Sequence, residues 1–139
     1  MKKEFQELVK AALKVKHNSY SPFSNFRVGA ALLSKDGRIF TGCNIENSSY
    51  GLTICAERVA IFNAISSGAS EFSAIAIISD SFDITPPCGA CRQVLSDLAR
   101  DIDIIMLDNK KRNKILKLSS LLPYAFTGKN MKRSYKLKK

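Results

Sequence analysis

The sequence predicts a single α/β domain with three layers, in which helices flank a mixed five-stranded sheet. Two near-continuous apolar runs, residues 72–79 and 102–107, are typical of strands that are buried on both faces of a sheet. Apolar residues at helical spacing precede and separate these runs. At 139 residues, the chain is long enough to bury a substantial core in one domain.

The first half of the chain predicts a helix, a β-hairpin and a second helix. The helix over residues 4–16 follows from one apolar stripe, formed by Phe5, Leu8, Val9, Ala12 and Leu13. Strands are expected over residues 26–34 and 38–43, joined by a turn that contains the Asp-Gly pair typical of hairpins. Small residues at positions 29–31 predict close packing of the first strand against a neighbour. After a polar loop, a helix is expected over residues 55–67, and Gly68 is expected to end it.

The second half predicts alternating strands and helices. In chain order we expect a buried strand over residues 72–79, a polar loop over 80–87, a helix over 88–100, a buried strand over 102–107, an edge strand over 114–118 and a helical turn over 119–123. Lys114 and Lys117 on the edge strand would discourage further pairing. The order predicts two β–helix–β crossovers, which should be right-handed.

The net charge of +10 is concentrated near the end of the chain. Residues 1–108 hold 11 Lys/Arg and 12 Asp/Glu, whereas residues 109–139 hold 11 Lys/Arg and no acidic residue. We interpret this excess as a solvated turn followed by a basic tail at residues 129–139, beyond a domain at residues 1–128. The alternative is weak electrostatic contact with RNA or another polyanion, and the near-neutral body argues against nucleic acid as a main partner.

The chain is expected to be a soluble, cytoplasmic protein with no membrane partner. Its first residues are charged and lack an apolar signal core, and its apolar runs are far too short to span a bilayer. In that setting, closely spaced cysteines indicate metal binding or catalysis more often than disulfides. Of the four cysteines, Cys43 is expected to be buried in a strand and inert.

The other three cysteines predict a catalytic zinc site. Cys88 and Cys91 lie three residues apart, so both sulfurs can reach one ion, and Cys55 supplies a third ligand. Each cysteine lies where a helix is expected to begin, and the partial positive charge of a helix N-terminus favours thiolates. Three protein ligands leave one tetrahedral position for water, which is the arrangement of catalytic zinc sites.

Glu57 is the expected proton carrier at this site. It lies two residues after Cys55, and at the open end of a helix its carboxyl can reach a zinc-bound water without binding the metal. The combination Cys55-Ala56-Glu57 with Pro87-Cys88-Gly89-Ala90-Cys91 matches the signature of zinc nucleobase deaminases in its three-cysteine form.

The match goes beyond these motifs, and four segments resemble the family in family order: Phe26–Ala31, Gly42–Asn47, Cys55–Arg58, which adds one residue to the first motif, and Leu121–Phe126. Over residues 4–128 the chain resembles cytidine deaminase, specifically the short homotetrameric class with three zinc-binding cysteines. The resemblance implies the cytidine deaminase fold, one zinc ion per subunit and active sites at subunit interfaces.

The resemblance also implies the reaction and the residues that bind substrate. Cytidine and deoxycytidine would be hydrolysed to uridine and deoxyuridine by a zinc-activated water, with release of ammonia, in pyrimidine salvage. Glu57 would move protons to the pyrimidine N3 and to the leaving amine. The residues expected to contact the nucleoside are Phe26, which packs against it, Asn44 and Glu46, which bind the sugar 3′-hydroxyl, the backbone of Ala56 at the base edge, and Phe126, which reaches a neighbouring subunit's pocket.

Arg58 is predicted to correct the charge of the metal site. A zinc ion with three thiolates carries a net charge of −1 and is a poor Lewis acid, so a nearby cation must withdraw charge. Arg58 follows Glu57 directly, and its guanidinium could donate to the ligand sulfurs. Arg92 could share this role or be an exposed helix cation.

Other functions remain open at this point. The three cysteines could form a structural zinc site or a redox pair in an interaction module, but that would leave Glu57 unexplained. The same fold could deaminate another aminopyrimidine nucleoside, such as blasticidin S. A nucleic-acid-binding or editing protein that uses the basic tail is a third class.

Overall fold

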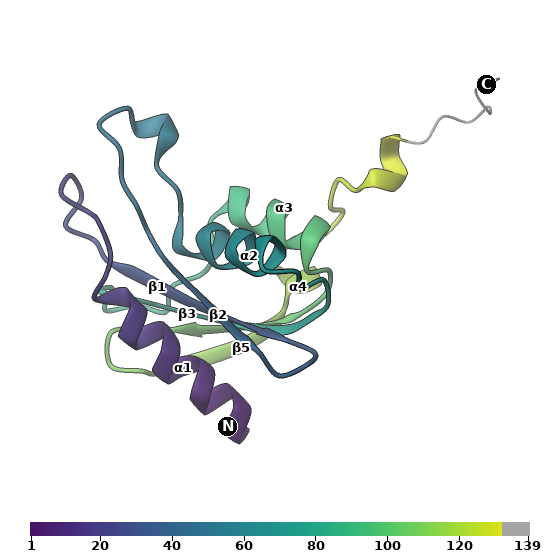
Figure 1. Cartoon of the computed structure of the whole chain (residues 1–139), viewed down its shortest axis with the longest axis horizontal. Coiled ribbons are helices and arrows are strands. Elements are labelled where there is room, and N and C mark those ends of the chain that lie inside the picture. The colour runs from purple at the N-terminus through teal and green to yellow at the C-terminus, as the bar shows by residue number, and fades with distance from the viewer. Residues whose placement is uncertain (132–139) are drawn as a thin grey trace.

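Five strands form one mixed sheet in the computed structural model, which describes residues 1–131 (Figure 1). The strands are β1 (Val28–Ser34), β2 (Ile39–Cys43), β3 (Phe72–Ser79), β4 (Asp103–Leu107) and β5 (Asn113–Lys117), and their order in the sheet is β2-β1-β3-β4-β5. Strands β3 and β4 are parallel, and every other neighbouring pair is antiparallel. The predicted mixed five-stranded sheet is therefore confirmed.

Helices cover both faces of this sheet and complete the three layers. They are α1 (Lys3–Lys16), α2 (Ala56–Ser66), α3 (Gly89–Leu98) and the short α4 (Leu118–Leu121). Helix α1 lies on one face, and α2, α3 and α4 lie on the other (Figure 1). None of the helices in residues 1–131 is both long and apolar enough to cross a membrane.

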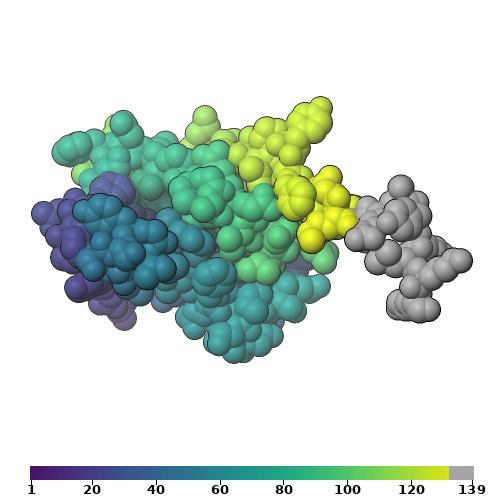
Figure 2. Space-filling view, turned by 90° about the horizontal axis from the view of Figure 1, so that it is seen from above, coloured from purple at the N-terminus to yellow at the C-terminus, as the bar shows by residue number. Residues whose placement is uncertain are grey.

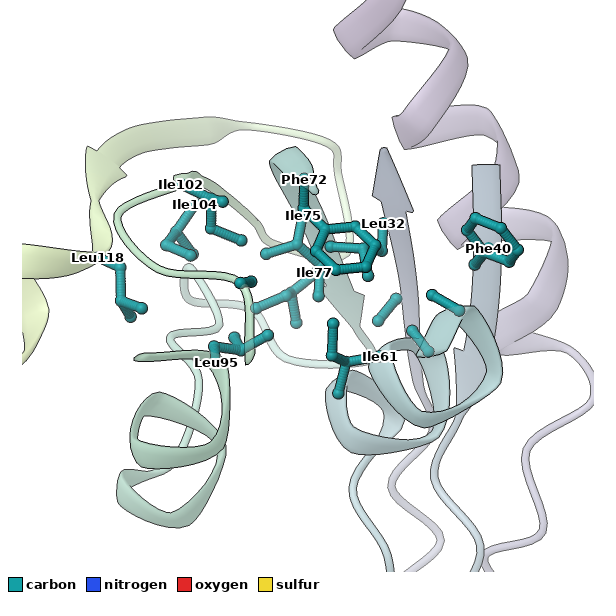
Figure 3. Close-up of a cluster of buried hydrophobic side chains, with 14 of the residues drawn as sticks. Leu32, Phe40, Ile61, Phe72, Ile75, Ile77, Leu95, Ile102, Ile104 and Leu118 are labelled. Carbon is teal, nitrogen blue, oxygen red and sulfur yellow. The ribbon is translucent and has the colours of Figure 1, made fainter. Parts of the chain in front are cut away.

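Side chains alternate between the two faces of the sheet along each strand, and each face has its own hydrophobic core. In β1, Ala30 and Leu32 belong to the cluster under α2 and α3, whereas Ala31 and Leu33 belong to the cluster under α1. Figure 3 shows the larger cluster, in which isoleucines of β3 and β4 meet Ile61 of α2 and Leu95 of α3. Because side chains alternate between faces, continuous apolar runs such as that of β3 can fill both cores.

Two glycines allow helices to pack closely on the sheet. A Cβ atom on Gly29 of β1 would lie 2.1 Å from the Ala12 carbonyl oxygen of α1, and one on Gly42 of β2 would lie 2.4 Å from the Ala60 nitrogen of α2. Both distances are far shorter than any contact between non-bonded heavy atoms, so only glycine permits this close packing. The close packing that the sequence predicted at Gly29 is confirmed.

The ends of the elements differ from the prediction in ways that matter for the site. The strand expected from Phe26 begins at Val28, and Cys55 and Cys88 each lie just before a helix instead of inside it. Helix α2 ends before Gly68, whose φ of +92° confirms it as the stop. Helix α3 ends before Arg100, which takes a left-handed φ of 64° that glycine usually supplies.

The topology brings the starts of α2 and α3 to one edge of the sheet. Strands β2 and β3 are both antiparallel to β1, so they end at the same edge. Each of these strands is followed along the chain by its loop and then by α2 or α3. The residues that precede β1 also lie at this edge, so residues 26, 44 and 80 are neighbours there although the sequence separates them widely.

The predicted basic tail falls largely outside the described part of the chain. Residues 128–131 form a 3₁₀ turn after the domain, and residues 132–139 lie outside the described residues. The division into a domain and a tail therefore stays a prediction.

Candidate active site

The three predicted metal ligands lie together. The Sγ atoms of Cys55, Cys88 and Cys91 all lie within 4.8 Å of one another, and those of Cys55 and Cys88 are 3.7 Å apart. Sulfurs at tetrahedral positions about 2.3 Å from a zinc ion are about 3.8 Å from each other. The cluster therefore fits a single zinc ion with one coordination position left for another ligand.

The helix starts explain why these sulfurs converge. Cys55 and Cys88 are the N-cap residues of α2 and α3, and neither side chain caps a backbone N–H of its helix, so both sulfurs can turn toward a shared ion. Cys91 follows in the first turn of α3 and is buried. A hydrogen bond from the Cys91 thiol lowers the pKa of Cys55 to about 5, and Arg58 adds to this effect against the cost of burial. The site thus favours a thiolate at Cys55, the form that binds a metal ion, whereas the contact with Cys55 and burial raise the pKa of Cys91.

Glu57 lies beside the sulfurs in the first turn of α2. The residue is only 4% exposed, and burial raises its pKa to about 7, although a hydrogen bond from its own backbone N–H opposes that shift. A carboxyl in this range can both take up and release a proton near neutral pH. Ala56, the first residue of α2, is also buried, and its N–H has no acceptor in a preceding helical turn.

The side chain of Arg58 turns to the cluster, whereas that of Arg92 does not. Arg58 Nη2 donates to Cys55 Sγ at 3.4 Å, and its buried Nε has no acceptor among the described residues. Arg92 instead donates to the carbonyl oxygens of Pro87 at 2.7 Å and Leu121 at 2.8 Å. The suggestion that Arg92 shares the role of Arg58 is therefore wrong, because its guanidinium is used to tie the loop before Cys88 to α4.

Asn44 is buried and braces the segment that carries Phe26. Its Oδ1 accepts hydrogen bonds from the Val28 N–H at 2.9 Å and from the Ser19 hydroxyl, and its Nδ2 donates to the Phe26 carbonyl at 2.7 Å. One Nδ2 hydrogen remains for another acceptor. Phe26 itself is 39% exposed, which leaves part of its ring available for contact with a ligand.

Glu46 extends this brace through Ser24, a residue that the sequence analysis missed. The Glu46 carboxylate accepts from the N–H groups of Phe23 at 2.9 Å and Ser24 at 3.1 Å, and from the Ser24 hydroxyl. The Ser24 hydroxyl oxygen in turn accepts the Phe26 N–H at 3.0 Å. The hydrogen bond from Ser24 lowers the pKa of Glu46, so the carboxylate is ionised. These bonds account for three of about four lone-pair positions on the carboxylate.

Phe126 does not join the other site residues within its own chain. Residues 20–26 and 44–52 project at one end of the molecule, whereas the segment around residue 126 leaves the body at the other end (Figures 1 and 2). The ring is exposed, with the residue 59% accessible, and the backbone carbonyl of Phe126 accepts a hydrogen bond from Gln93 Nε2 at 2.8 Å. Helix α3 therefore fixes this segment as well as two of the sulfurs.

Cys43, the remaining cysteine, lies apart from this chemistry. It is buried at the end of β2, as predicted, and burial raises the pKa of its thiol. A buried protonated thiol is a poor nucleophile.

The sequence matches a known family over most of its length. Residues 2–106 match the family described as the cytidine and deoxycytidylate deaminase zinc-binding region. The chain is 47% identical to the cytidine deaminase of Halalkalibacterium halodurans over 127 residues, which cover 91% of this chain and 96% of that protein. A more distant relative is the blasticidin-S deaminase of Bacillus cereus, which is 35% identical over 72% of this chain and 76% of its own length.

Comparison with solved structures identifies the same family as comparison of the sequences. The crystal structure of cytidine deaminase from Burkholderia pseudomallei superposes with a TM-score of 0.86 at 40% identity, covering 91% of this chain and all of that one. The likeness thus extends over the sheet, the helices and the loops that bring the three sulfurs and Glu57 together. This chain belongs to the cytidine deaminase family of zinc-dependent hydrolases.

Proposed function

We propose that the protein hydrolyses cytidine and deoxycytidine to uridine and deoxyuridine, releasing ammonia, in pyrimidine salvage in the cytoplasm. The observation that carries this proposal is the convergence of three cysteine sulfurs with one buried carboxyl that is not needed as a ligand. A structural zinc site is normally closed by four protein ligands. Among the described residues only the three cysteines form a group that could hold the ion, and the Glu57 carboxyl is not part of it.

The chain's own residues divide the work at the reacting end of the substrate. When bound, zinc would supply Lewis-acid activation of a water molecule for attack at C4 of the pyrimidine. Glu57 takes one proton of that water and delivers it to N3 as the oxygen adds to C4. It then takes the remaining proton of the added hydroxyl and passes it to the amine, so that the C4–N bond breaks, ammonia leaves and C4 becomes a carbonyl. The Ala56 backbone holds the base edge, since its N–H at the start of α2 has no intrahelical partner.

The sugar would be held by the groups around Phe26. Asn44 has one amide hydrogen left to donate, and Glu46 has one lone-pair position left to accept, so together they suit a hydroxyl that both accepts and donates. The 3′-hydroxyl is common to cytidine and deoxycytidine, which is why both are proposed as substrates. Phe26 packs against the nucleoside from the same segment.

Arg58 is proposed to balance the charge of the metal site. Its contact with Cys55 and its unpartnered Nε place cationic donors beside the thiolates. A guanidinium there offsets the surplus negative charge of a zinc ion with three thiolates, and it keeps that ion electrophilic.

The test of the proposed function is an ultraviolet assay for loss of the 4-amino group. The purified protein is expected to turn over both cytidine and deoxycytidine, to lose activity on removal of zinc by a chelator, and to regain it when zinc is restored. Blasticidin S, a cytosine-containing oligonucleotide and free cytosine serve as competing substrates. A higher kcat/KM for blasticidin S would favour the related activity, turnover of the oligonucleotide alone would favour an editing protein, and no turnover would favour a zinc-stapled interaction module.

We further propose that the protein is a homotetramer whose active sites combine residues of neighbouring subunits. The support is that Phe126 is exposed, and that the segment around residue 126 leaves the body at the end of the molecule opposite the projecting segments 20–26 and 44–52 (Figures 1 and 2). A second subunit is the simplest way to bring such a ring to a nucleoside. The near-neutral body of the chain argues against a polynucleotide as the ligand.

Mixed tetramers should show this sharing directly. Glu57→Gln and Phe126→Ala chains, each impaired alone, are mixed and reassembled, and activity is measured with cytidine well below its KM. If Phe126 acts on a neighbour's site, random assembly restores about one quarter of the sites to the full residue set. If Phe126 serves its own chain, no site regains both residues and activity stays at the mean of the two parents.

A further inference from the structure

The carboxylate of Asp80 holds the backbone just before β1. Its Oδ2 accepts the Arg27 N–H at 3.0 Å, and the Asp80 N–H donates to the Arg27 carbonyl at 3.2 Å. The Arg27 guanidinium adds two bonds, from Nε to Oδ2 at 3.0 Å and from Nη2 to Oδ1 at 3.1 Å. Asp80 directly follows β3, so these bonds continue the β1–β3 pairing by one residue beyond its last backbone pair, Val28 with Ser79.

Asn44 holds the opposite edge of the segment formed by residues 26–28. It directly follows β2, and its amide bonds to the Phe26 carbonyl and the Val28 N–H. Successive backbone groups of an extended chain point to opposite edges, so Asn44 meets residues 26 and 28 while Asp80 meets residue 27. Because β1 lies between β2 and β3, the segment is clamped from both sides by the residues that follow those strands.

A buried lysine completes the arrangement around Asp80. Lys16, the last residue of α1, has a side chain only 8% exposed, and its Nζ donates to Asp80 Oδ1 at 2.9 Å. His17, the residue after Lys16, is a further titratable neighbour, and its Nδ1 lies 3.5 Å from Arg27 Nη1. Burial opposes ionisation of Asp80, but the bonds from Arg27 and Lys16 outweigh it and hold its pKa well below the usual range. The Lys16 side chain is buried and that of Asp80 is partly buried. Because taking such charges out of water offsets most of their attraction, the pair adds little net stability and is better explained by the geometry that it fixes.

We propose that Asp80 is a positioning residue for the deaminase reaction, acting through the backbone of residues 26–28 to keep Phe26 in place against the nucleoside. This inference rests on the proposed function. Asp80 touches no reacting atom in the scheme above. Its effect is expected on binding that is common to the substrate and the transition state, so KM should rise while kcat changes little.

The test compares two variants that both remove the buried cation. Asp80→Ala alone would leave Lys16 buried without a counter-charge and would destabilise the fold. The double variant Lys16→Met/Asp80→Ala avoids this, and Lys16→Met alone is the matched control because it keeps every bond between Asp80 and Arg27. The Arg27 guanidinium is partly exposed and can turn to water in the double variant.

Steady-state kinetics with cytidine, bound zinc and amide hydrogen exchange are measured for both variants. Relative to Lys16→Met, the double variant should show KM raised about tenfold, kcat within about twofold, unchanged zinc content, and faster exchange at the Arg27 and Val28 amides. Equal KM values would overturn the inference, and so would loss of zinc or failure to fold, because Asp80 would then be a structural residue. If the wild-type protein does not deaminate cytidine, the proposed function is wrong whatever Asp80 does. In that case the hold of Asp80 on residues 26–28 is still tested by amide exchange, and unchanged exchange at Arg27 and Val28 would reject it.

Discussion

The variant Glu57→Gln is expected to bind zinc as the wild-type protein does and to lose turnover of cytidine by about 10³-fold or more, at the upper end of what one proton-transferring group contributes. Glutamine has the same shape and can still form hydrogen bonds, but it cannot take up a proton from water and release it to N3 or to the amine. Because Glu57 is 4% exposed, the isosteric change avoids a cavity or a clash. The loss should appear in kcat, since the missing interaction is one made in the transition state.

Two measurements separate this chemical effect from damage to the fold. Zinc content per chain should stay at one, and the unfolding temperature should not fall, because an amide is easier to bury than a carboxylate. The matched control is Glu71→Gln, an exposed glutamate next to β3 that should leave turnover unchanged. A Glu57→Gln enzyme that retained more than a tenth of wild-type turnover would remove Glu57 from the proposed mechanism.

The chemistry of the metal made the centre of the site predictable from sequence. Thiolates must lie close to a common ion, so the spacing of Cys88 and Cys91 and the position of Cys55 at a helix start limited where the sulfurs could be. The same reasoning identified Arg58, since a zinc ion with three thiolates needs a cation nearby, and the structure places Arg58 against Cys55. The catalytic role of Glu57 stays a prediction that the variant above will test.

The surroundings of Phe26 could not be predicted, because they depend on strand order. Hydrophobic periodicity indicates that β1, β2 and β3 exist, but it does not place β1 between the other two. Only that order brings Asn44 and Asp80 to opposite edges of the same segment. Their side chains replace ladder bonds there, which is why the strand expected from Phe26 begins at Val28. Arg92 was misjudged for a related reason, since its carbonyl partners lie on a loop and a helix that are far apart in sequence.

Zinc retention is expected to decrease in the order wild type, Arg58→Ala, Cys91→Ser. Cys91 supplies one of the three sulfurs and is completely buried. A serine hydroxyl in its place is neither as readily ionised nor as soft a ligand as a thiolate. In Cys91→Ser, two cysteines and one weakly binding serine should not retain zinc through purification, so turnover should fall to background. Arg58→Ala keeps all three sulfurs but leaves the cluster with its surplus negative charge, and removal of such a supporting group typically weakens metal binding by about 10- to 100-fold.

The order can be measured by competition with a chromogenic zinc chelator, followed by assay of each protein with zinc in excess. Saturating zinc should restore the metal to Arg58→Ala but not its full turnover, because a more negative site is a weaker Lewis acid. Arg38→Ala is the matched control: Arg38 lies beyond the β1–β2 turn, where it pairs with Asp36, and its loss should change neither quantity. If Arg58→Ala has wild-type turnover at saturating zinc, Arg58 helps only to retain the metal. If its zinc affinity is also that of the wild type, Arg58 has no role at the site.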